Sequence, residues 1–217
     1  MSAIVYLWRF CLGCVAAAFF GLAVLFFLAP LRPGDAPTTG STAYRTEAEG
    51  SNARRHYLPN GMSIATRLDW PLIAAENLHQ FDRFGLAPRA GNETRILLAT
   101  ADARTPAQMR GALFLIDTGG TATDPVTKMR RFMDAIRPKL TQATVIHEAK
   151  PSTIAGYDGA TAGFRAVQEG HIGTRTVNAR FELIHAARRS LLAIQVSVIG
   201  SRAGTQIQDM LASLRVE

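Results

Sequence analysis

A long apolar run opens the chain, and shorter hydrophobic segments alternate with polar stretches after it. Residues 10–29 contain no charged side chain, and at about 1.5 Å of rise per residue such a helix matches a bilayer core of roughly 30 Å. The run exceeds the roughly 7–15 apolar residues of a cleaved secretory signal. The pattern predicts an uncleaved membrane anchor within residues 1–31, with the anchoring side chains Phe10, Phe19, Phe20, Leu25, Phe26 and Phe27.

Residues that favour the membrane interface stand directly before this run. Tyr6 and Trp8 carry rings that settle at headgroup level, and Arg9 can extend its guanidinium to water. Basic residues nearly balance on the two sides, so the positive-inside rule does not decide the orientation. A short tail before an apolar run is typical of a signal anchor. We therefore expect a single-pass protein of a bacterial inner membrane, with its body outside the cytoplasm, in the periplasm.

The rest of the chain divides into a predicted linker and one predicted domain. Residues 31–52 are rich in Pro, Gly, Ser and Thr and hold almost no large apolar side chain, so they cannot offset their own ordering entropy. We predict a flexible linker over residues 32–56. Residues 57–217 have the right length for one domain around one hydrophobic core.

Hydrophobic periodicity in the body predicts a mixture of strands and helices. Asp124 and Pro125 form a helix start, after which Met129, Met133 and Ile136 recur at helical spacing. Helices are predicted at residues 72–84, 124–140 and 203–214. Strands are predicted at residues 62–68, 94–100, 111–118, 144–148, 160–169, 174–187 and 190–199. A loop containing Pro151 and Gly156 is predicted before the last three strands. The predicted fold is α+β: an N-terminal transmembrane helix, then one domain whose mainly antiparallel sheet is covered by helices.

The net charge of the chain and its distribution limit the classes of partner that the protein is expected to bind. The chain has 24 basic and 17 acidic residues, a net charge of +7, and the basic residues are spread along the whole sequence. Paired arginines lack the interleaved aromatic residues that stack bases, so nucleic-acid binding is not expected. A diffuse basic surface suits anionic headgroups or an acidic partner. Both cysteines, Cys11 and Cys14, lie inside the apolar run, so the body forms no disulfide.

One segment resembles a catalytic motif. Asp117 follows two apolar residues and precedes Thr118 and Gly119, the arrangement in which aspartic proteases present a carboxylate. Such an enzyme needs two carboxylates that share a proton, and the chain has no second Asp-Thr-Gly, although a homodimer could supply one. A protease would also require residues 124–140 to be mostly non-helical. We interpret Asp117 as the structural end of a buried strand, bonding the turn at residues 118–120.

Other chemistry finds little support, and we predict no cofactor or metal. The five histidines fall on separate predicted elements without metal-ligand spacing, and polar surface or rim positions are expected for them: His56, His79, His147, His171 and His185. Three glutamates, Glu148, Glu169 and Glu182, could face one another across strands, but pairing with arginines such as Arg165 and Arg180 is the simpler hypothesis.

Three short motifs resemble the PsbP-like fold, which extrinsic photosystem proteins, a Ran-binding nuclear-import accessory protein and many bacterial envelope proteins share. Residues 61–64 followed by Trp70 resemble the opening of that family, residues 156–160 its entry into the meander, and residues 210–214 its closing helix. The match spans residues 57–216. One departure is that Asp69, and not proline, precedes the tryptophan. The resemblance implies a binding or assembly role without shared catalytic residues.

The sequence therefore predicts a membrane-tethered, non-enzymatic accessory or assembly subunit that docks on a larger membrane protein complex. Tethering raises the local concentration of the body, so a modest interface suffices. Two alternatives stay open. One is a membrane-anchored aspartic protease that uses Asp117, and the other is a solute-binding or sensor module of the cell envelope.

Overall fold

The computed structural model describes residues 45–74, 77–81, 95–139, 143–170, 173–186 and 188–217. These residues belong to a compact unit, residues 38–217, that is separate from residues 1–37. The predicted membrane anchor, its interface residues and the start of the linker lie outside the described residues. Within the described ranges, no helix is both long enough and apolar enough to span a bilayer.

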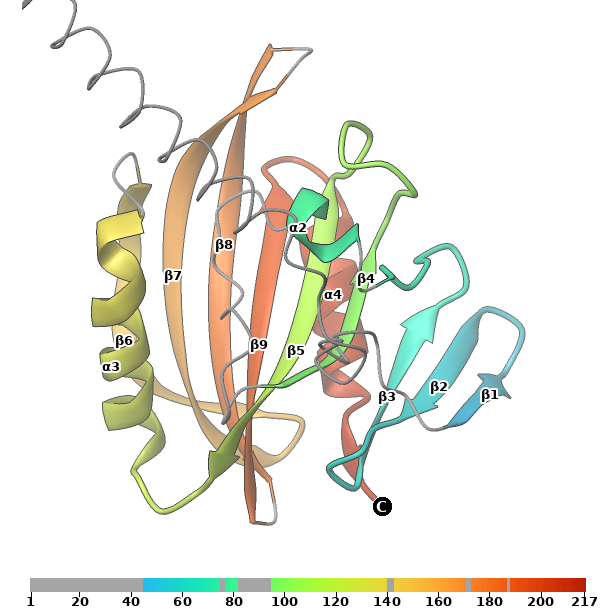
Figure 1. Ribbon diagram of the computed structural model, residues 1–217, viewed down its shortest axis with the longest axis vertical. Helices are drawn as coiled ribbons and strands as arrows, with labels where there is room; N and C mark the ends of the chain where they lie inside the picture. The colour runs from blue at the N-terminus through green and yellow to red at the C-terminus, as the bar shows by residue number, and fades with distance from the viewer. Residues whose placement is uncertain (1–44, 75–76, 82–94, 140–142, 171–172, 187) are drawn as a thin grey trace, which may run out of the picture. The chain divides into compact units, whose positions relative to one another are not determined.

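A six-stranded antiparallel sheet forms the centre of the body (Figure 1). The last three strands predicted from the sequence pair in chain order, and the strand before them adds a fourth at the edge. The α+β class with antiparallel pairing is confirmed. The strands, in their order across the sheet, are β4 (Arg95–Ala101), β5 (Gly111–Gly120), β9 (Arg189–Val198), β8 (Gly173–Ala186), β7 (Tyr157–Gly170) and β6 (Ala143–Ile154).

A second, four-stranded antiparallel sheet was not predicted. It consists of β1 (Arg45–Glu49), β2 (Ala53–Tyr57), β3 (Met62–Arg67) and β10 (Arg215–Val216). The interpretation of residues 45–56 as flexible linker was wrong, because their polar side chains find partners inside this sheet. Arg55 is buried, donates to Ser63 Oγ at 2.9 Å and pairs with Glu49 at 2.7 Å.

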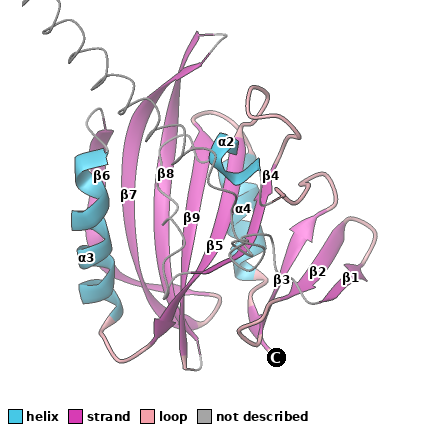
Figure 2. Cartoon of the chain, viewed as in Figure 1, coloured by secondary structure: helices cyan, strands magenta, loops and turns pink. Residues whose placement is uncertain are grey.

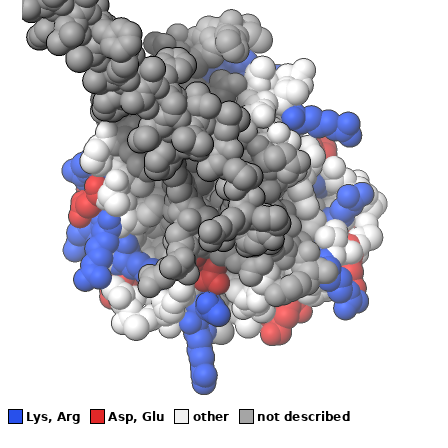
Figure 3. Space-filling model, viewed as in Figure 1, with Lys and Arg blue, Asp and Glu red and all other residues white. Residues whose placement is uncertain are grey.

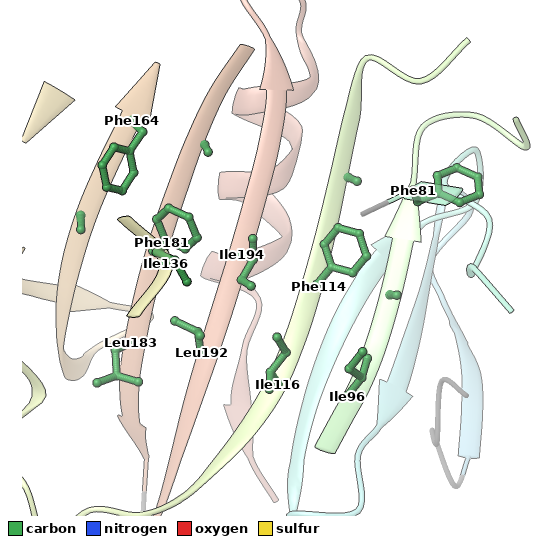
Figure 4. Packing of buried hydrophobic residues seen from close by; sticks show 14 of the residues in the cluster. Phe81, Ile96, Phe114, Ile116, Ile136, Phe164, Phe181, Leu183, Leu192 and Ile194 are labelled. Atoms are coloured by element: carbon green, nitrogen blue, oxygen red, sulfur yellow. The ribbon is translucent and has the colours of Figure 1, made fainter. Parts of the chain in front are cut away.

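Two helices cover opposite faces of the large sheet (Figure 2). Helix α3 (Pro125–Ile136) packs against β6, β7 and β8, and helix α4 (Ala203–Ala212) packs against β5, β9 and β3. On the α3 face, buried aromatic and aliphatic side chains project away from α4 (Figure 4). Phe181 lies at their centre, with ring centroids 5.4 Å from Phe132 and 5.8 Å from Phe164. The predicted cap is confirmed, since Thr127 N donates to Asp124 Oδ2 at 2.8 Å.

Two local predictions were wrong. The helix predicted at residues 72–84 is reduced to α2 (Leu78–Phe81) in the described part, because Leu72 and Ile73 pair with the edge of β4, where Ile73 N donates to Ala99 O at 2.8 Å. The loop predicted around Pro151 is strand, since β6 continues to Ile154. A proline is tolerated there because β6 lies at the sheet edge and its residues need no partner on one side.

Candidate functional site

The α4 side of the large sheet carries a set of polar residues, most of them on strands against which α4 does not pack. Strand register arranges them in rows across β6, β7, β8 and β9. The rows are Lys150, Thr161 and Glu182; His147, Gly163, Arg180 and Gln195; and Thr144, Arg165, Asn178 and Ser197. We call these residues the open face. No described helix packs on β6, β7 and β8 on this side, because α3 packs on the opposite side of the sheet and α4 packs on β5 and β9, where its Gln208 reaches Gln195.

Exposed basic side chains dominate the open face. Lys150, Arg165 and Arg180 project from three neighbouring strands and are all exposed. The one carboxylate among the open-face residues is Glu182, whose Oε1 lies 2.7 Å from Arg180 Nη2. Arginine forks bind carboxylates and phosphates through two parallel hydrogen bonds, so this surface suits an anionic partner.

Glu182 is unusual because it is a carboxylate with 1% of its surface exposed. Burial raises its pKa above the ordinary value, and the nearby charge of Arg180 opposes that rise. Two amides lie beside it, with Gln208 Nε2 of α4 donating to Gln195 Oε1 at 2.6 Å. A buried carboxylate with a raised pKa beside an exposed cationic surface marks a candidate functional site.

Buried polar atoms of the open face include some that lack a hydrogen-bond partner among the described residues. They are Thr161 Oγ1, in the row of Glu182, and Asn178 Oδ1, in the row of Arg165. Buried polar atoms are normally paired, so unpaired ones need an explanation such as water, an ion or a ligand group. The open face therefore has free hydrogen-bonding capacity next to its basic side chains.

A glycine shapes one part of the open face. The ring of His147 lies over Gly163, where an added Cβ would come within 2.9 Å of His147 Nε2. Gly163 therefore allows the imidazole to lie flat against β7. His147 Nδ1 is 3.3 Å from Glu148 O, and the side chain is half-buried. The imidazole thus joins Arg180 in the middle row of the open face.

Asp117 lies elsewhere, at the end of β5. Its Oδ1 accepts from Gly119 N at 2.9 Å, in a turn where Gly119 has φ of +84°, and its Oδ2 lies 3.5 Å from Arg189 Nη1. This geometry agrees with the structural role expected from the sequence. The rival aspartic-protease architecture required non-helical residues after Asp124, and α3 contradicts it. The described residues also contain no cluster of metal-ligating side chains.

The structure contradicts the surface position expected for His56, and it shows that Glu148 and Glu182 do not lie together. His56 is buried, not at the surface, with Nε2 at 2.8 Å from Thr66 Oγ1. Glu148 pairs with Arg137 at 2.9 Å, so it does not meet Glu182, and the side chain of Glu169 lies outside the described residues. The pairing of Glu182 with Arg180 is confirmed.

Most of the open face was not predicted as a site. Lys150, Thr161, Gln195 and Gln208 were not singled out, because their proximity depends on strand register and on the position of α4. A weak signal was available in β8, where the polar residues Asn178, Arg180 and Glu182 occupy every second position.

Basic side chains also gather over α3, at the left of Figure 3. Exposed members of this second group include Arg130, Arg131 and Arg137. They stand on the opposite side of the sheet from the open face. Positive charge alone therefore does not distinguish the open face, whereas its combination with buried, unpaired polar atoms does.

No protein-family model matches the sequence, and no curated protein matches it. Solved structures show weak similarity. The Ran-binding protein Mog1p of Saccharomyces cerevisiae aligns with a TM-score of 0.43 and 11% identity, over 76% of this chain and 95% of that one. LpqN of Mycobacterium tuberculosis, involved in cell envelope biogenesis, aligns with a TM-score of 0.39 and 10% identity, over 78% of this chain and 86% of that one.

A protein of Bacteroides thetaiotaomicron aligns with a TM-score of 0.42 and 10% identity, over 72% of this chain. The alignment spans only 45% of that protein, so this chain matches less than half of its length. Similarities of this strength carry no argument about function, and the resemblance to the PsbP-like family stays a prediction.

Proposed function

We propose that this protein is a membrane-tethered, non-enzymatic accessory subunit whose body docks through the open face on an acidic surface of a larger membrane protein complex. One observation carries the proposal. Lys150, Arg165 and Arg180 stand exposed on β6, β7 and β8, three adjacent strands on which no described helix packs on that side. A partner that presents carboxylates would meet two arginine forks and an ammonium group on one surface.

The predicted anchor supports the proposal from the sequence side. A body held near a membrane by the run at residues 10–29 meets its partner at effective concentrations up to the millimolar range. A small interface of charge-assisted contacts is then sufficient for stable docking. The complex would lie in a bacterial inner membrane, with the body in the periplasm.

A charge-reversal experiment tests the open face directly. The full-length protein is purified from native membranes in mild detergent, and the proteins that accompany it are identified and quantified. The test variant combines Lys150→Glu with Arg165→Glu. The matched control combines Arg130→Glu with Arg131→Glu, exposed residues of α3 on the other side of the sheet, and changes the net charge equally.

We expect the wild type and the control to retain a stoichiometric membrane complex, and the test variant to lose it. Retention of the complex by the test variant would contradict docking through the open face. Purification of the wild type as a lone monomer with a bound small molecule would instead favour the solute-binding alternative.

A further inference from the structure

A hollow of about 550 Å³ lies at one end of the large sheet, next to the row of Asn178 and Ser197, and none of the open-face residues lines it. The loop between β4 and β5 and the turn between β9 and α4 come together at that end of the sheet (Figure 1). Side chains that line the hollow include Gln108, Arg110, Arg175, Val198, Ile199 and Ser201. Its volume falls within the range of roughly 300–1,000 Å³ that is common for small-molecule sites.

Hydrogen bonds hold the walls of the hollow in place. Asp102 Oδ1 accepts from Arg110 N at 2.8 Å and from Gly111 N at 3.0 Å, which ties the two ends of the loop together. Val198 N donates to Arg110 O at 2.7 Å and joins the loop to the end of β9. On the other wall, Ser201 Oγ donates to Val198 O at 2.7 Å. The hollow is therefore formed before any ligand enters.

The lining combines cationic and apolar side chains. Arg110 and Arg175 contribute two guanidinium groups, and no carboxylate belongs to the lining. Arg175 Nη1 donates to Met109 O at 3.4 Å, and the guanidinium has further N–H donors. Val198 and Ile199 supply apolar surface, and Ile199 is 43% exposed although it is a large aliphatic residue.

We propose that this hollow binds a small organic anion. Its carboxylate or phosphate group is held by Arg110 and Arg175, and its apolar body rests on Val198 and Ile199. Two arginines in the lining, with no acidic residue among the lining residues, favour a negatively charged ligand. The apolar wall selects for an organic ion over a bare inorganic one. The site shares no residue with the open face, so a test of anion binding and a test of the proposed docking function have independent outcomes.

Titration calorimetry on the full-length protein in lipid nanodiscs tests the site. The probes are phenyl phosphate and benzoate, which carry the anion and an apolar ring, inorganic phosphate, which carries only the charge, and benzyl alcohol, which carries only the ring. We expect saturable binding of phenyl phosphate or benzoate. Inorganic phosphate and benzyl alcohol should each bind at least about tenfold more weakly, because each lacks one of the two contacts.

Variants locate the binding. Arg110→Gln and Arg175→Gln should each weaken binding of the aromatic anions by about tenfold or more, as expected for losing a charge-assisted pair. Arg104→Gln is the control, because Arg104 is exposed in the same loop and does not line the hollow. Two independent variants guard against the misfolding of either one.

Several results would overturn the proposal. They are the absence of binding by both aromatic anions, unchanged affinity in both arginine variants, or equal affinity for phenyl phosphate and inorganic phosphate. Loss of a membrane complex in the open-face variant, with anion binding intact, would leave the hollow assigned and separate the two sites.

Discussion

Removing the charge of Glu182 should stabilise the folded body at neutral pH, whereas removing the charge of its partner Arg180 should destabilise it. The two residues form one ion pair, but their surroundings differ. The side chain of Glu182 is 1% exposed and that of Arg180 is 45% exposed. When Glu182→Gln removes the carboxylate, the guanidinium that remains is solvated. When Arg180→Gln removes the guanidinium, the carboxylate that remains is buried.

The magnitudes follow from this asymmetry. Burial raises the pKa of Glu182, and each pKa unit of that rise means that ionisation of this group costs the folded state about 1.4 kcal/mol at neutral pH. The ion pair offsets at most about 1 kcal/mol, since Arg180 is half exposed to solvent. Glu182→Gln should therefore raise the free energy of unfolding by about 1 kcal/mol at pH 7.

Arg180→Gln should lower the free energy of unfolding by about 1 kcal/mol, which is the part of the ionisation cost that the ion pair offsets. The loss is limited because Glu182 can take up a proton and the amides of Gln195 and Gln208 remain beside it. The double variant should recover most of this loss, because it no longer buries a charge.

The pH dependence has a defined sign. An acid whose folded pKa is raised above the ordinary value of 4.5 binds more protons in the folded state between those two pKa values. Its stabilising contribution is complete below pH 4.5 and is lost as the pH rises through the folded pKa. The advantage of Glu182→Gln over the wild type should therefore be near zero at the acid end and grow toward neutral pH.

Urea unfolding of residues 38–217, a compact unit of their own, gives the measurement. Trp70 is the one tryptophan of this segment and is buried, so its fluorescence reports unfolding. The reasoning is refuted if Glu182→Gln destabilises the body at pH 7, or if Arg180→Gln is as well tolerated as the Glu182 variant.

Three further predictions follow from single contacts. Asp124→Ala should lower the free energy of unfolding by about 1 kcal/mol, because it removes the cap of α3. The control Asp134→Ala, an exposed change in the same helix, should change this free energy by less than about 0.5 kcal/mol. Equal urea midpoints for the two variants would contradict the capping role of Asp124. Burial lowers the pKa of His56 below 6.5, so stability should fall as the pH drops below that value, and His56→Gln should flatten this dependence in the same assay. Asp117→Asn should leave the fold intact, and neither this variant nor the wild type should cleave peptides. If the wild type cleaved peptides at mildly acidic pH and this variant did not, the binding-module hypothesis would be wrong.

Local signals in the sequence predicted most of the large sheet and both long helices. Continuous apolar runs located β4 and β5, and the cap and helical spacing after Asp124 located α3. The small sheet was not predicted because β2 buries Arg55 and His56, residues that a hydrophobic pattern assigns to the surface. Their partners, Ser63 and Thr66, lie on the next strand and become apparent only once the strands pair.

The candidate site was less predictable than the fold. The sequence suggested that Glu148, Glu169 and Glu182 pair with arginines such as Arg165 and Arg180. Glu182 does pair with Arg180, since alternate residues of one strand share a face. The sequence did not show that Gln208 of α4 would reach Gln195, or that His147 would lie over Gly163. These contacts depend on helix placement and on β-bulges in β6, which no local pattern specifies. The hollow likewise joins two loops that are far apart in the chain.

Helix dimensions explain why the open face is polar at all. A helix is about 10 Å wide, and strands lie about 4.8 Å apart, so one helix covers roughly two strands. Helix α4 covers β5 and β9 and shares its other side with β3, so none of the described helices packs on β6, β7 and β8 on that side. Polar residues there are a requirement of solubility and say nothing about function.

The sign of the charge is not required in the same way. Solubility would be served equally by acidic residues at positions 150 and 165, yet Lys150 and Arg165 are both basic. Glu182, the one acid among the residues that define the open face, is buried. Neutral substitutions at these positions should therefore change partner binding without changing folding stability. Replacing Lys150 and Arg165 by glutamine keeps the surface polar and should leave unfolding unchanged, while partner binding should weaken with the loss of charge. If binding persisted, the open face would be a solvated surface and the docking site would have to lie elsewhere, with the arginines of α3 as the next candidates.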